Sequence, residues 1–221
     1  MRNPQRVPPC GVTFDRRRSN EPVRLITTMT YPTNRPELLR RFNTGEAFDF
    51  VFFWGHQPKI GQTVDQHCLS QWFAAPFEID GILYPTAEHF MMAEKARLFR
   101  DATTLAAILQ AKDPGTVKSL GRKISGFIQS EWEQQRFEIV VRGNYAKFVQ
   151  NSALNDYLQS TADCILVEAS PYDPIWGIGL AEQDEAVHNP NQWRGLNLLG
   201  FAIMAVRANL CNDRPDSLHT L

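Results

Sequence analysis

The hydrophobic and polar pattern of this chain predicts a few short strands. Residues 50–54 form a compact apolar and aromatic run, FVFFW, whose length and composition are typical of a buried β-strand. Residues 76–84 place short apolar segments on both sides of Asp80-Gly81, a dipeptide that favours the type I′ turn of a β-hairpin. Residues 164–168, CILVE, form a further short apolar run that we interpret as a strand.

The chain also carries signals for about six helices, each opened by a residue that can cap a helix. A Ser, Thr, Asp or Asn side chain at this position accepts a hydrogen bond from a free backbone N–H of the first turn. Pro114 suits a first helical position, and Ser130 with Glu133 has the spacing of a capping box. The expected caps are Thr86, Asp101, Asp113, Ser130, Ser152 and Asn197, for helices over about 87–99, 102–111, 114–123, 131–150, 153–160 and 198–210.

The order of these elements sets the expected fold class. Helices do not alternate with strands, so a doubly wound sheet is disfavoured and a mainly helical α+β single domain is expected. Residues 46–212 would form this domain, and residues 171–195 would be a long ordered loop in it. Residues 1–45 contain nine Arg, no Lys, three acidic residues and six Pro without apolar periodicity, which indicates a flexible basic tail. Residues 213–221 would form a short C-terminal tail.

Charge and composition narrow the class of protein. The 221 residues carry a formal net charge of −1, which argues against whole-protein steering onto nucleic acid or an anionic membrane. No run of about 18 apolar residues occurs and the chain start has no apolar core, so neither a membrane span nor a secretory signal is expected. The four Cys are scattered without a C-x-x-C pair, which favours reduced thiols in a cytoplasmic protein over a zinc site or a disulfide framework.

Several motifs that would assign a cofactor or a metal are incomplete. Residues 177–182 begin like G-x-G-x-x-G but lack the third Gly, and residues 115–122 do not match a P-loop. The chain has no zinc-deaminase signature and no G-x-S-x-G nucleophile elbow, and its five His form no H-x3-H pattern. We therefore expect neither a metal nor a cofactor.

Several residues remain as candidates for a site, each with a structural alternative. At about 100° per residue, Glu88 and Lys95 share one stripe of the predicted helix 87–99 with apolar neighbours. They could equally be a capping glutamate and a lysine that extends its ammonium to solvent. Trp132 stands at the start of its helix, where core and ligand cleft can both use it. Asp173 precedes a proline and could open a turn without taking part in chemistry.

Longer segments of the chain indicate a protein family more specifically than these single positions do. They are DGILYPTAEHF from residue 80, KSLGR from residue 118, VEASPYDPIWGIGL from residue 167 and WRGLNLLG from residue 193. In this order and spacing, over about residues 48–211, the chain resembles the YbiA-like family, also called NADAR (NAD- and ADP-ribose-associated). The chain departs from the family at residues 69–73, where it has Leu-Ser-Gln-Trp-Phe in place of Leu-Ser-Asn-Phe. This departure could change the fine specificity.

The resemblance implies an enzyme that hydrolyses an N-glycosidic bond. Some family members cleave early phosphorylated intermediates of the riboflavin pathway and release ribose 5-phosphate, and others remove ADP-ribose from guanine in nucleic acid. The implied catalytic residues are Glu88, Trp132 and Asp173. The motifs that match also suggest substrate-binding residues, which are Lys95, Arg122, Trp176, Asn197 and Arg207, with Lys118 as a weaker candidate. The expected partner is a phosphorylated ribosyl small molecule, and nucleic acid only under the second activity.

The roles expected of these residues follow from the chemistry of the bond. Breaking the C1′–N bond develops positive charge on the ribose, so one carboxylate can orient the attacking water and another can bind ribose or steer a proton. We assign the first role to Glu88 and the second to Asp173. Trp132 would provide a stacking wall and Arg122 a phosphate ligand. Two other functions stay open: a deglycosylase of nucleic acid, and a module that binds ADP-ribose or a nucleotide without turnover.

Overall fold

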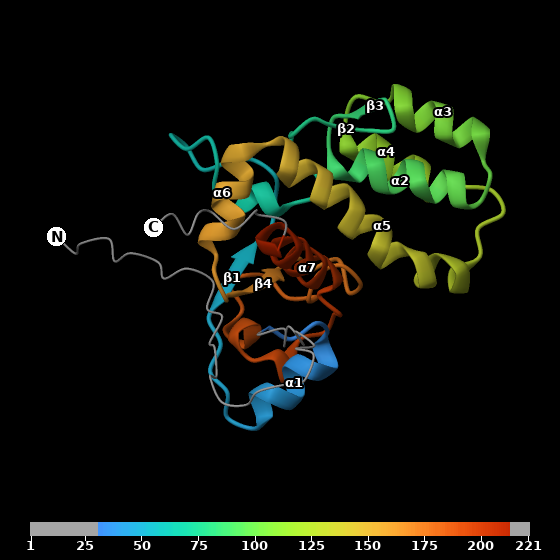
Figure 1. Cartoon of the computed structure of the whole chain (residues 1–221). Coiled ribbons are helices and arrows are strands. Elements are labelled where there is room, and N and C mark those ends of the chain that lie inside the picture. The colour runs from blue at the N-terminus through green and yellow to red at the C-terminus, as the bar shows by residue number, and fades with distance from the viewer. Residues whose placement is uncertain (1–30, 213–221) are drawn as a thin grey trace, which may run out of the picture.

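Two small sheets and one long helix organise the molecule (Figure 1). The computed structural model describes residues 31–212, and these form an α+β single domain, as the sequence predicts. The strands are β1 (Phe50–Phe53), β2 (Phe77–Ile79), β3 (Ile82–Tyr84) and β4 (Ile165–Glu168). The α-helices of the described part are α1 (Arg35–Asn43), α2 (Ala87–Leu98), α3 (Ala102–Gln110), α4 (Pro114–Gly121), α5 (Gln129–Gln150), α6 (Ser152–Ser160) and α7 (Leu198–Asn212). Short 3-10 helices are η1 (Gln66–Leu69), η2 (Glu185–His188) and η3 (Pro190–Gln192).

The central sheet is a parallel pair, β1 and β4, formed by segments that are remote in the chain. Its register places Phe53, the last residue of β1, opposite Glu168, the last residue of β4. Helix α7 covers β4 so closely that a Cβ on Gly200 would lie 2.0 Å from the carbonyl oxygen of Leu166. Because both strands run in the same direction, their carboxyl ends lie at one edge of the sheet, where following loops can form a site.

The hairpin and the caps of α2, α3 and α4 form as predicted. Asp80 and Gly81 have φ values of 53° and 75°, the pair of positive angles that a type I′ turn requires. Thr86, Asp101 and Asp113 each accept a hydrogen bond from the backbone N–H of the third residue of the helix that follows. These elements depend on side chains within a few positions of each other, so local residue order is enough to predict them.

Helix α5 packs on α2 and on α7, the helix that covers β4, and it joins the group formed by α2, α3 and α4 to that helix (Figure 1). The approach of α2 to α5 requires a glycine, because a Cβ on Gly143 would lie 2.4 Å from the ring of Phe90. Lys147, one turn further along, is fully buried and donates to the carbonyl oxygens of Cys68 and Ser70 at 2.7 and 2.8 Å. The end of η1 and the residue that follows it are therefore fixed on α5.

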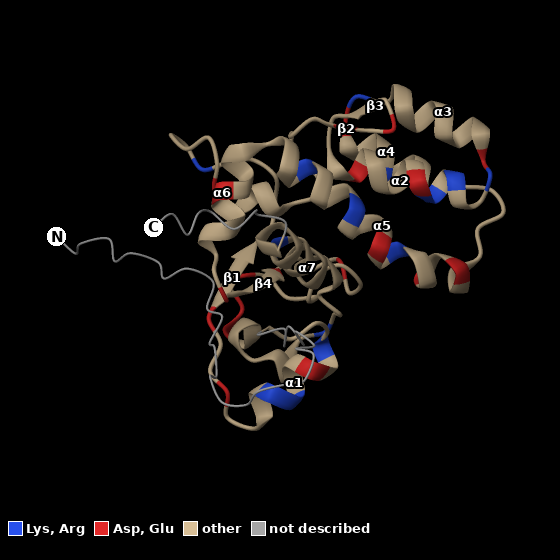
Figure 2. Cartoon of the chain, in the orientation of Figure 1, with Lys and Arg blue, Asp and Glu red and all other residues tan. Residues whose placement is uncertain are grey.

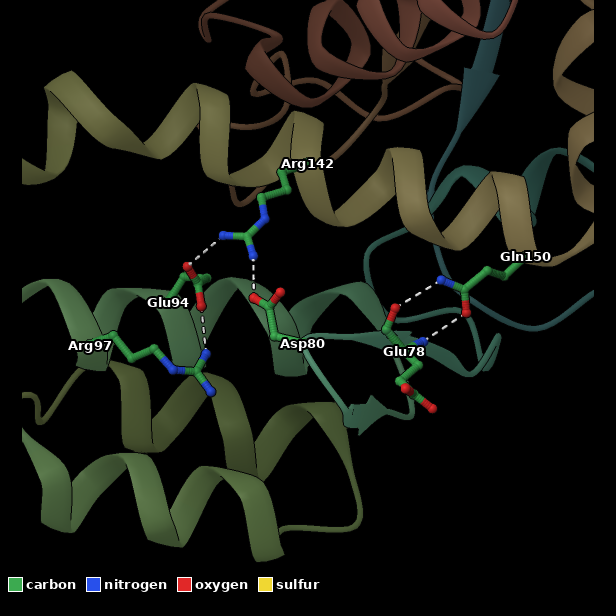
Figure 3. A network of polar contacts seen from close by, with 6 residues as sticks. All are labelled: Glu78, Asp80, Glu94, Arg97, Arg142 and Gln150. Atoms are coloured by element: carbon green, nitrogen blue, oxygen red, sulfur yellow. Dashed lines mark hydrogen bonds and ion pairs between the residues drawn. The ribbon is translucent and has the colours of Figure 1, made fainter. Parts of the chain in front are cut away.

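A polar network on the surface holds α2 and the hairpin against α5 (Figure 3). Arg142 on α5 donates to Asp80 in the hairpin turn at 2.6 Å and to Glu94 on α2 at 3.4 Å. Gln150 exchanges two hydrogen bonds of 2.8 Å with the backbone of Glu78. Exposed ion pairs of this kind contribute only about 0–1 kcal/mol each to the free energy of unfolding. The network therefore fixes the orientation of α2 and adds little to the stability of the protein.

Helix α1 corrects the prediction of a structureless tail through residue 45. Asn34 caps this helix by accepting from the backbone N–H of Glu37, and Leu38 is fully buried. Arg35 donates to the carbonyl oxygen of Trp193 at 2.7 Å, so the helix is docked on the segment after η3. The sequence prediction missed this helix because the segment is rich in Arg and Pro and because only one residue of the helix, Leu38, lies in the core. Residues 1–30 and 213–221 lie outside the described residues, so the rest of the tail predictions are unaffected.

Three of the predicted caps are wrong, namely Ser130, Ser152 and Asn197. Helix α5 begins at Gln129 after Ile128, without a side-chain cap, and the side chain of Glu133 accepts from Gln129 at 2.6 Å instead of closing a capping box. Ser152 is the first residue of α6, not its cap. Helix α5 is long and packs on α2 and α7, so tertiary contacts place its start without a local signal. No helix within residues 31–212 is both long enough and apolar enough to cross a membrane.

Candidate active site

The described residues form a pocket of about 190 Å³ where α2, α4 and α5 meet the segment that follows β4. Its charged lining consists of three carboxyl groups and three cations, Glu88, Glu168 and Asp173 with Lys95, Lys118 and Arg122. Its aromatic lining is Trp72, Trp132 and Trp176. Six of the eight predicted site residues line this one pocket although they come from remote segments: Glu88, Lys95, Arg122, Trp132, Asp173 and Trp176.

Glu88 enters the pocket from the first turn of α2. The Thr86 cap starts the helix, and the backbone N–H of Glu88 donates to the carbonyl oxygen of Gln71 at 3.0 Å. Glu88 is 3% exposed, and its Oε1 atom has no hydrogen-bond partner among the described residues. A buried polar atom without a partner costs free energy, which a bound ligand or water can recover. The Oε1 atom is therefore available to a ligand.

The surroundings of Glu88 place its titration close to neutral pH. Burial raises the pKa of Glu88 to about 7, against the opposing charge of Lys118. The charge of Asp173 adds to the increase, whereas a hydrogen bond from Trp72 and the charge of Arg122 reduce it. A carboxyl group with a pKa near the working pH can exchange a proton during a reaction.

Asp173 combines the turn role and the site role that the sequence left as alternatives. Its Oδ1 atom accepts hydrogen bonds from the backbone N–H groups of Ile175 and Trp176, at 2.9 and 2.8 Å. Its Oδ2 atom lies 3.9 Å from the ammonium nitrogen of Lys118. One oxygen thus holds the turn after β4, and the other faces a cation of the pocket.

Glu168, the last residue of β4, lines the pocket but was missed in the sequence. Its Oε2 atom is buried and has no hydrogen-bond partner among the described residues. Burial raises the pKa of Glu168 to about 8, with an additional increase from the charge of Asp173 and an opposing effect of Lys118. A carboxylate that ends an apolar strand was the signal that could have found it, because ligands bind at the carboxyl ends of parallel strands.

Trp132 serves the core and the pocket together. It is 7% exposed, in the first turn of α5, and it contributes to the pocket lining. The ammonium nitrogen of Lys95 lies 5.5 Å from the centre of its ring and 4.3 Å from the centre of the Phe127 ring. Trp72 has the ammonium nitrogen of Lys118 at 5.8 Å from its ring centre. Two indole rings are therefore each paired with a cation at the pocket.

The three cations of the pocket differ in whether protein atoms already bind their charged groups. The ammonium of Lys95 donates to the carbonyl oxygen of Gly121 at 2.8 Å, which joins α2 to the last residue of α4. Burial lowers the pKa of Lys95, and the charge of Glu88 offsets part of this effect. Arg122 follows α4 as its C-cap residue and is exposed, so its guanidinium can reach a ligand anion at the pocket.

Comparison with known protein families decides the classification. The NADAR domain matches residues 52–211 of this chain. The chain belongs to the NADAR family. N-glycosidase R617 of Acanthamoeba polyphaga mimivirus is 40% identical to it over 168 residues, which cover 73% of this chain and 96% of that relative. N-glycosidase YbiA of Escherichia coli (strain K12) is 29% identical over 146 residues, which cover 66% of this chain and 82% of that relative.

A solved structure of a NADAR relative has the same fold. The NMR structure of the E. coli protein YbiA matches with a TM-score of 0.61 at 26% identity, and the match covers 77% of this chain and 90% of that chain. Together with the named relatives, this confirms the family and the enzyme class that the sequence predicts: the chain is an N-glycosidase in the general sense.

Asn197 is not placed in the pocket of this NADAR domain, contrary to its predicted substrate-binding role. It is fully buried, its Oδ1 atom accepts from the backbone N–H of Glu168 at 3.0 Å, and its Nδ2 atom donates to the carbonyl oxygen of Leu166 at 2.9 Å. Its φ of 55° also excludes the extended backbone expected of a helix cap. Asn197 instead joins the start of α7 to β4, and through β4 it positions Glu168.

Replacing Asn197 with alanine should therefore lower stability rather than affinity. The variant loses two buried hydrogen bonds and places alanine at a positive φ, which together should cost about 2–4 kcal/mol. Chemical denaturation measures this loss, and Gln183→Ala, which removes an exposed amide side chain, is the control with a change below about 0.5 kcal/mol. A higher Michaelis constant together with an unchanged free energy of unfolding would contradict the structural role of Asn197.

Arg207 is the second predicted binding residue that lies elsewhere. It is 5% exposed on α7, and it donates to the hydroxyl of Thr161 at 2.7 Å and to the carbonyl oxygen of Cys164 at 3.0 Å. Its guanidinium thus holds the turn between α6 and β4. Arg207 lies in a segment that matches the family, but in this structure its side chain binds the turn before β4 and does not line the pocket.

The departure from the family pattern at residues 69–73 falls in the pocket. Gln71 is buried and lines the pocket, and its side-chain oxygen accepts from Asn144 at 2.7 Å. Trp72 also lines the pocket and donates to Glu88. The changed residues therefore contact the candidate catalytic group, as expected of a segment that sets specificity. Among residues 31–212, no cluster of three or more His, Cys, Asp or Glu side chains is arranged to hold a metal ion.

Proposed function

We propose that this NADAR protein hydrolyses the C1′–N bond of a phosphorylated N-ribosyl compound, with early riboflavin-pathway intermediates as its substrates and ribose 5-phosphate as a product. The observation that carries the proposal is the convergence of Glu88 and Asp173 on one pocket, beside an indole wall and several cations. A binder of an anionic ligand would have little use for carboxylates at this place, because they repel the ligand.

In the proposed reaction, Glu88 orients the attacking water and takes its proton. Its buried Oε1 atom has no protein partner, so a water molecule can occupy that position. Asp173 faces the ribose with its Oδ2 atom, where a negative charge stabilises the oxocarbenium-like transition state. Trp132 provides a flat apolar surface for the ribose or the base, worth about 1–3 kcal/mol by analogy with base stacking.

The size of the pocket favours a small substrate. Its volume of about 190 Å³ is below the roughly 300–1,000 Å³ of sites that enclose drug-sized ligands. A ribose phosphate fits this space better than a complete ADP-ribose. Lys and Arg residues are interspersed with Asp and Glu residues along α2 and α5 (Figure 2), and the net charge is −1, which supports a small molecule over a long nucleic acid as partner.

The substrate phosphate would bind at Arg122. A guanidinium forms paired hydrogen bonds with phosphate oxygens, and Arg122 is the exposed cation of the pocket, whereas Lys95 is bonded to Gly121 and Lys118 faces Asp173. We expect Arg122→Ala to raise the Michaelis constant for a phosphorylated substrate about 10–100-fold with little change in kcat. Arg100→Ala, an exposed arginine beyond α2, is the control. An equal loss on the dephosphorylated substrate would contradict a phosphate role.

A substrate panel tests the proposed function. The protein is incubated with a phosphorylated ribosylamino pyrimidine of the riboflavin pathway, with DNA carrying ADP-ribosylated guanine, and with NAD, and free sugar is detected by mass spectrometry. Release of ribose 5-phosphate from the first compound supports the proposal. Release of ADP-ribose from DNA alone would assign the nucleic-acid activity instead, and binding without release would assign a binding module. The reaction as proposed uses no cofactor, and the cytoplasmic location stays a prediction.

A further inference from the structure

Glu168 is the carboxyl group of the pocket that the proposed reaction leaves without a role. It stands at the carboxyl end of β4, in the same pocket as Glu88 and Asp173. Its Oε2 atom is buried and has no hydrogen-bond partner among the described residues. A structural carboxylate in such a place would be expected to have an arginine, a lysine or backbone N–H groups within hydrogen-bond distance. The free oxygen indicates that Glu168 is directed at a ligand.

The backbone of Glu168 is held on both sides, which fixes the direction of its side chain. Its N–H donates to the Asn197 side chain at 3.0 Å, and its carbonyl oxygen accepts from the N–H of Ile178 at 3.0 Å. A Cβ on Gly177 would lie 2.9 Å from that carbonyl oxygen, so the following loop packs tightly on it. Rigid support of this kind is typical of groups that must meet a reacting atom.

The charged groups that face Glu168 come from three segments, and they favour its neutral form. Asp173 follows β4 and Glu88 stands on α2, and both carry charge of the same sign, whereas Lys118 on α4 opposes them. On the two elements packed against β4, the neighbouring residues are apolar: Phe53 on β1 and Leu199 on α7. Burial raises the pKa of Glu168 to about 8, so the group retains its proton at neutral pH.

Glu88 and Glu168 therefore have different surroundings in one pocket. Glu88 accepts a hydrogen bond from Trp72 and is near the charges of Lys118 and Arg122, all of which favour its ionised form. Glu168 has the opposing charge of Lys118 alone among these groups. When two acidic groups interact, the proton is held by the group whose surroundings stabilise its charge less. Of the two acids, Glu168 therefore keeps its proton to the higher pH.

We propose that Glu168 is a third catalytic residue, the acid that protonates the departing nitrogen; this assignment rests on the proposed function. As the C1′–N bond breaks, its electron pair stays on the nitrogen, which takes the proton from Glu168. Water forms the new C1′–O bond and gives its proton to Glu88. The carboxylate of Glu168 then regains a proton from Glu88 or from solvent, and the net reaction consumes one water molecule.

The first test compares Glu168→Gln with wild type on the phosphorylated ribosylamino substrate. Glutamine keeps the size of the side chain but cannot donate this proton, so kcat should fall about 10²–10⁴-fold. The wild-type rate should decline as pH rises through about 8, and the variant should lack this decline. Glu182→Gln, the same substitution at an exposed position of the following loop, should behave as wild type. A fully active Glu168→Gln enzyme would overturn the assignment.

The second test does not need turnover, so it separates this inference from the proposed function. Carbon-13 NMR of protein labelled at the glutamate carboxyl carbons follows each titration, and Glu168→Gln identifies the signal of this residue. We expect a signal that remains protonated at pH 7 and is lost in the variant, with the fold confirmed by circular dichroism. Titration of Glu168 near pH 4 would overturn the inference even if the enzyme hydrolyses its substrate. A protonated Glu168 in a protein that hydrolyses none of the panel would overturn the proposed function and, with it, the catalytic role.

Discussion

Glu88→Gln is expected to abolish hydrolysis while the fold persists, with kcat reduced by about 10³-fold or more. Glutamine has the shape of glutamate but cannot take a proton from the attacking water. Glu88 is 3% exposed in the pocket, and the packing of α2 should accept the neutral amide, since the carboxyl group already has a pKa of about 7 there. The Michaelis constant should change little, because the phosphate contact at Arg122 is unaffected.

Single-turnover measurement of ribose 5-phosphate release, together with thermal unfolding, checks this expectation. Glu94→Gln is the matched control, because Glu94 stands on the same helix and bonds to Arg97 and Arg142 outside the pocket (Figure 3). That variant should retain wild-type turnover. Near-normal turnover by a folded Glu88→Gln protein would remove Glu88 from the reaction and leave the pocket without a base.

The second large effect is an unusual dependence of stability on pH. The pKa values of Glu88 and Glu168 in the folded state are about 7 and about 8, above the value of 4.5 expected in the unfolded chain. Between these values the folded state binds more protons than the unfolded state, so the free energy of unfolding falls as pH rises from about 5 to about 8. Glu88 alone should contribute a decline on the order of 3 kcal/mol. His89, whose pKa burial lowers, opposes part of it.

Above about pH 8 the trend should reverse because of Lys147. Burial lowers the pKa of this lysine to about 8, below the value of 10.5 expected in the unfolded chain. From about pH 8 to about pH 9 the unfolded state therefore binds more protons, and stability rises with pH. Above about pH 9 the thiol of Cys68, whose pKa burial raises from 9.0 to about 12, opposes this rise. A minimum of stability near pH 8 is therefore expected, where the buried acids are ionised and the buried lysine is still partly charged.

Urea denaturation between pH 5 and pH 10 measures this profile. Glu88→Gln should reduce the decline below pH 8, and Lys147→Met should reduce the rise above it, although this variant also loses the bonds to Cys68 and Ser70. Glu94→Gln should keep the minimum. A free energy of unfolding that stays constant or increases from pH 5 to pH 8 would show that the acids of the pocket are ionised in the folded protein.

Local residue order is sufficient for a large part of the fold. The hairpin at Asp80-Gly81 and the caps at Thr86, Asp101 and Asp113 depend on contacts within a few positions, and they form as predicted. The start of α5 differs, because Ile128 provides no cap and packing on α2 and α7 sets the boundary. Helix α1 was missed because one buried Leu in an Arg-rich segment makes no periodic pattern.

The candidate site, like the fold, was predicted only in part from the sequence. Long matching segments identified the NADAR family and put Glu88, Trp132 and Asp173 forward as catalytic candidates, and the pocket brings these three together. The family motifs could not separate residues that bind a ligand from residues that hold the backbone. Asn197 lies in such a motif, yet its side chain is used entirely by β4.

The surroundings of Glu168 and the pKa values of the pocket depend on the tertiary structure. In the sequence, Glu168 is the polar end of an apolar strand, and nothing near it in the chain shows which charges it will face. Folding buries it beside Glu88, Asp173 and Lys118, which come from α2, the loop after β4 and α4. Burial and the distances between charges determine the pKa of each acid, and residues far apart in the chain acquire such distances only when the chain folds.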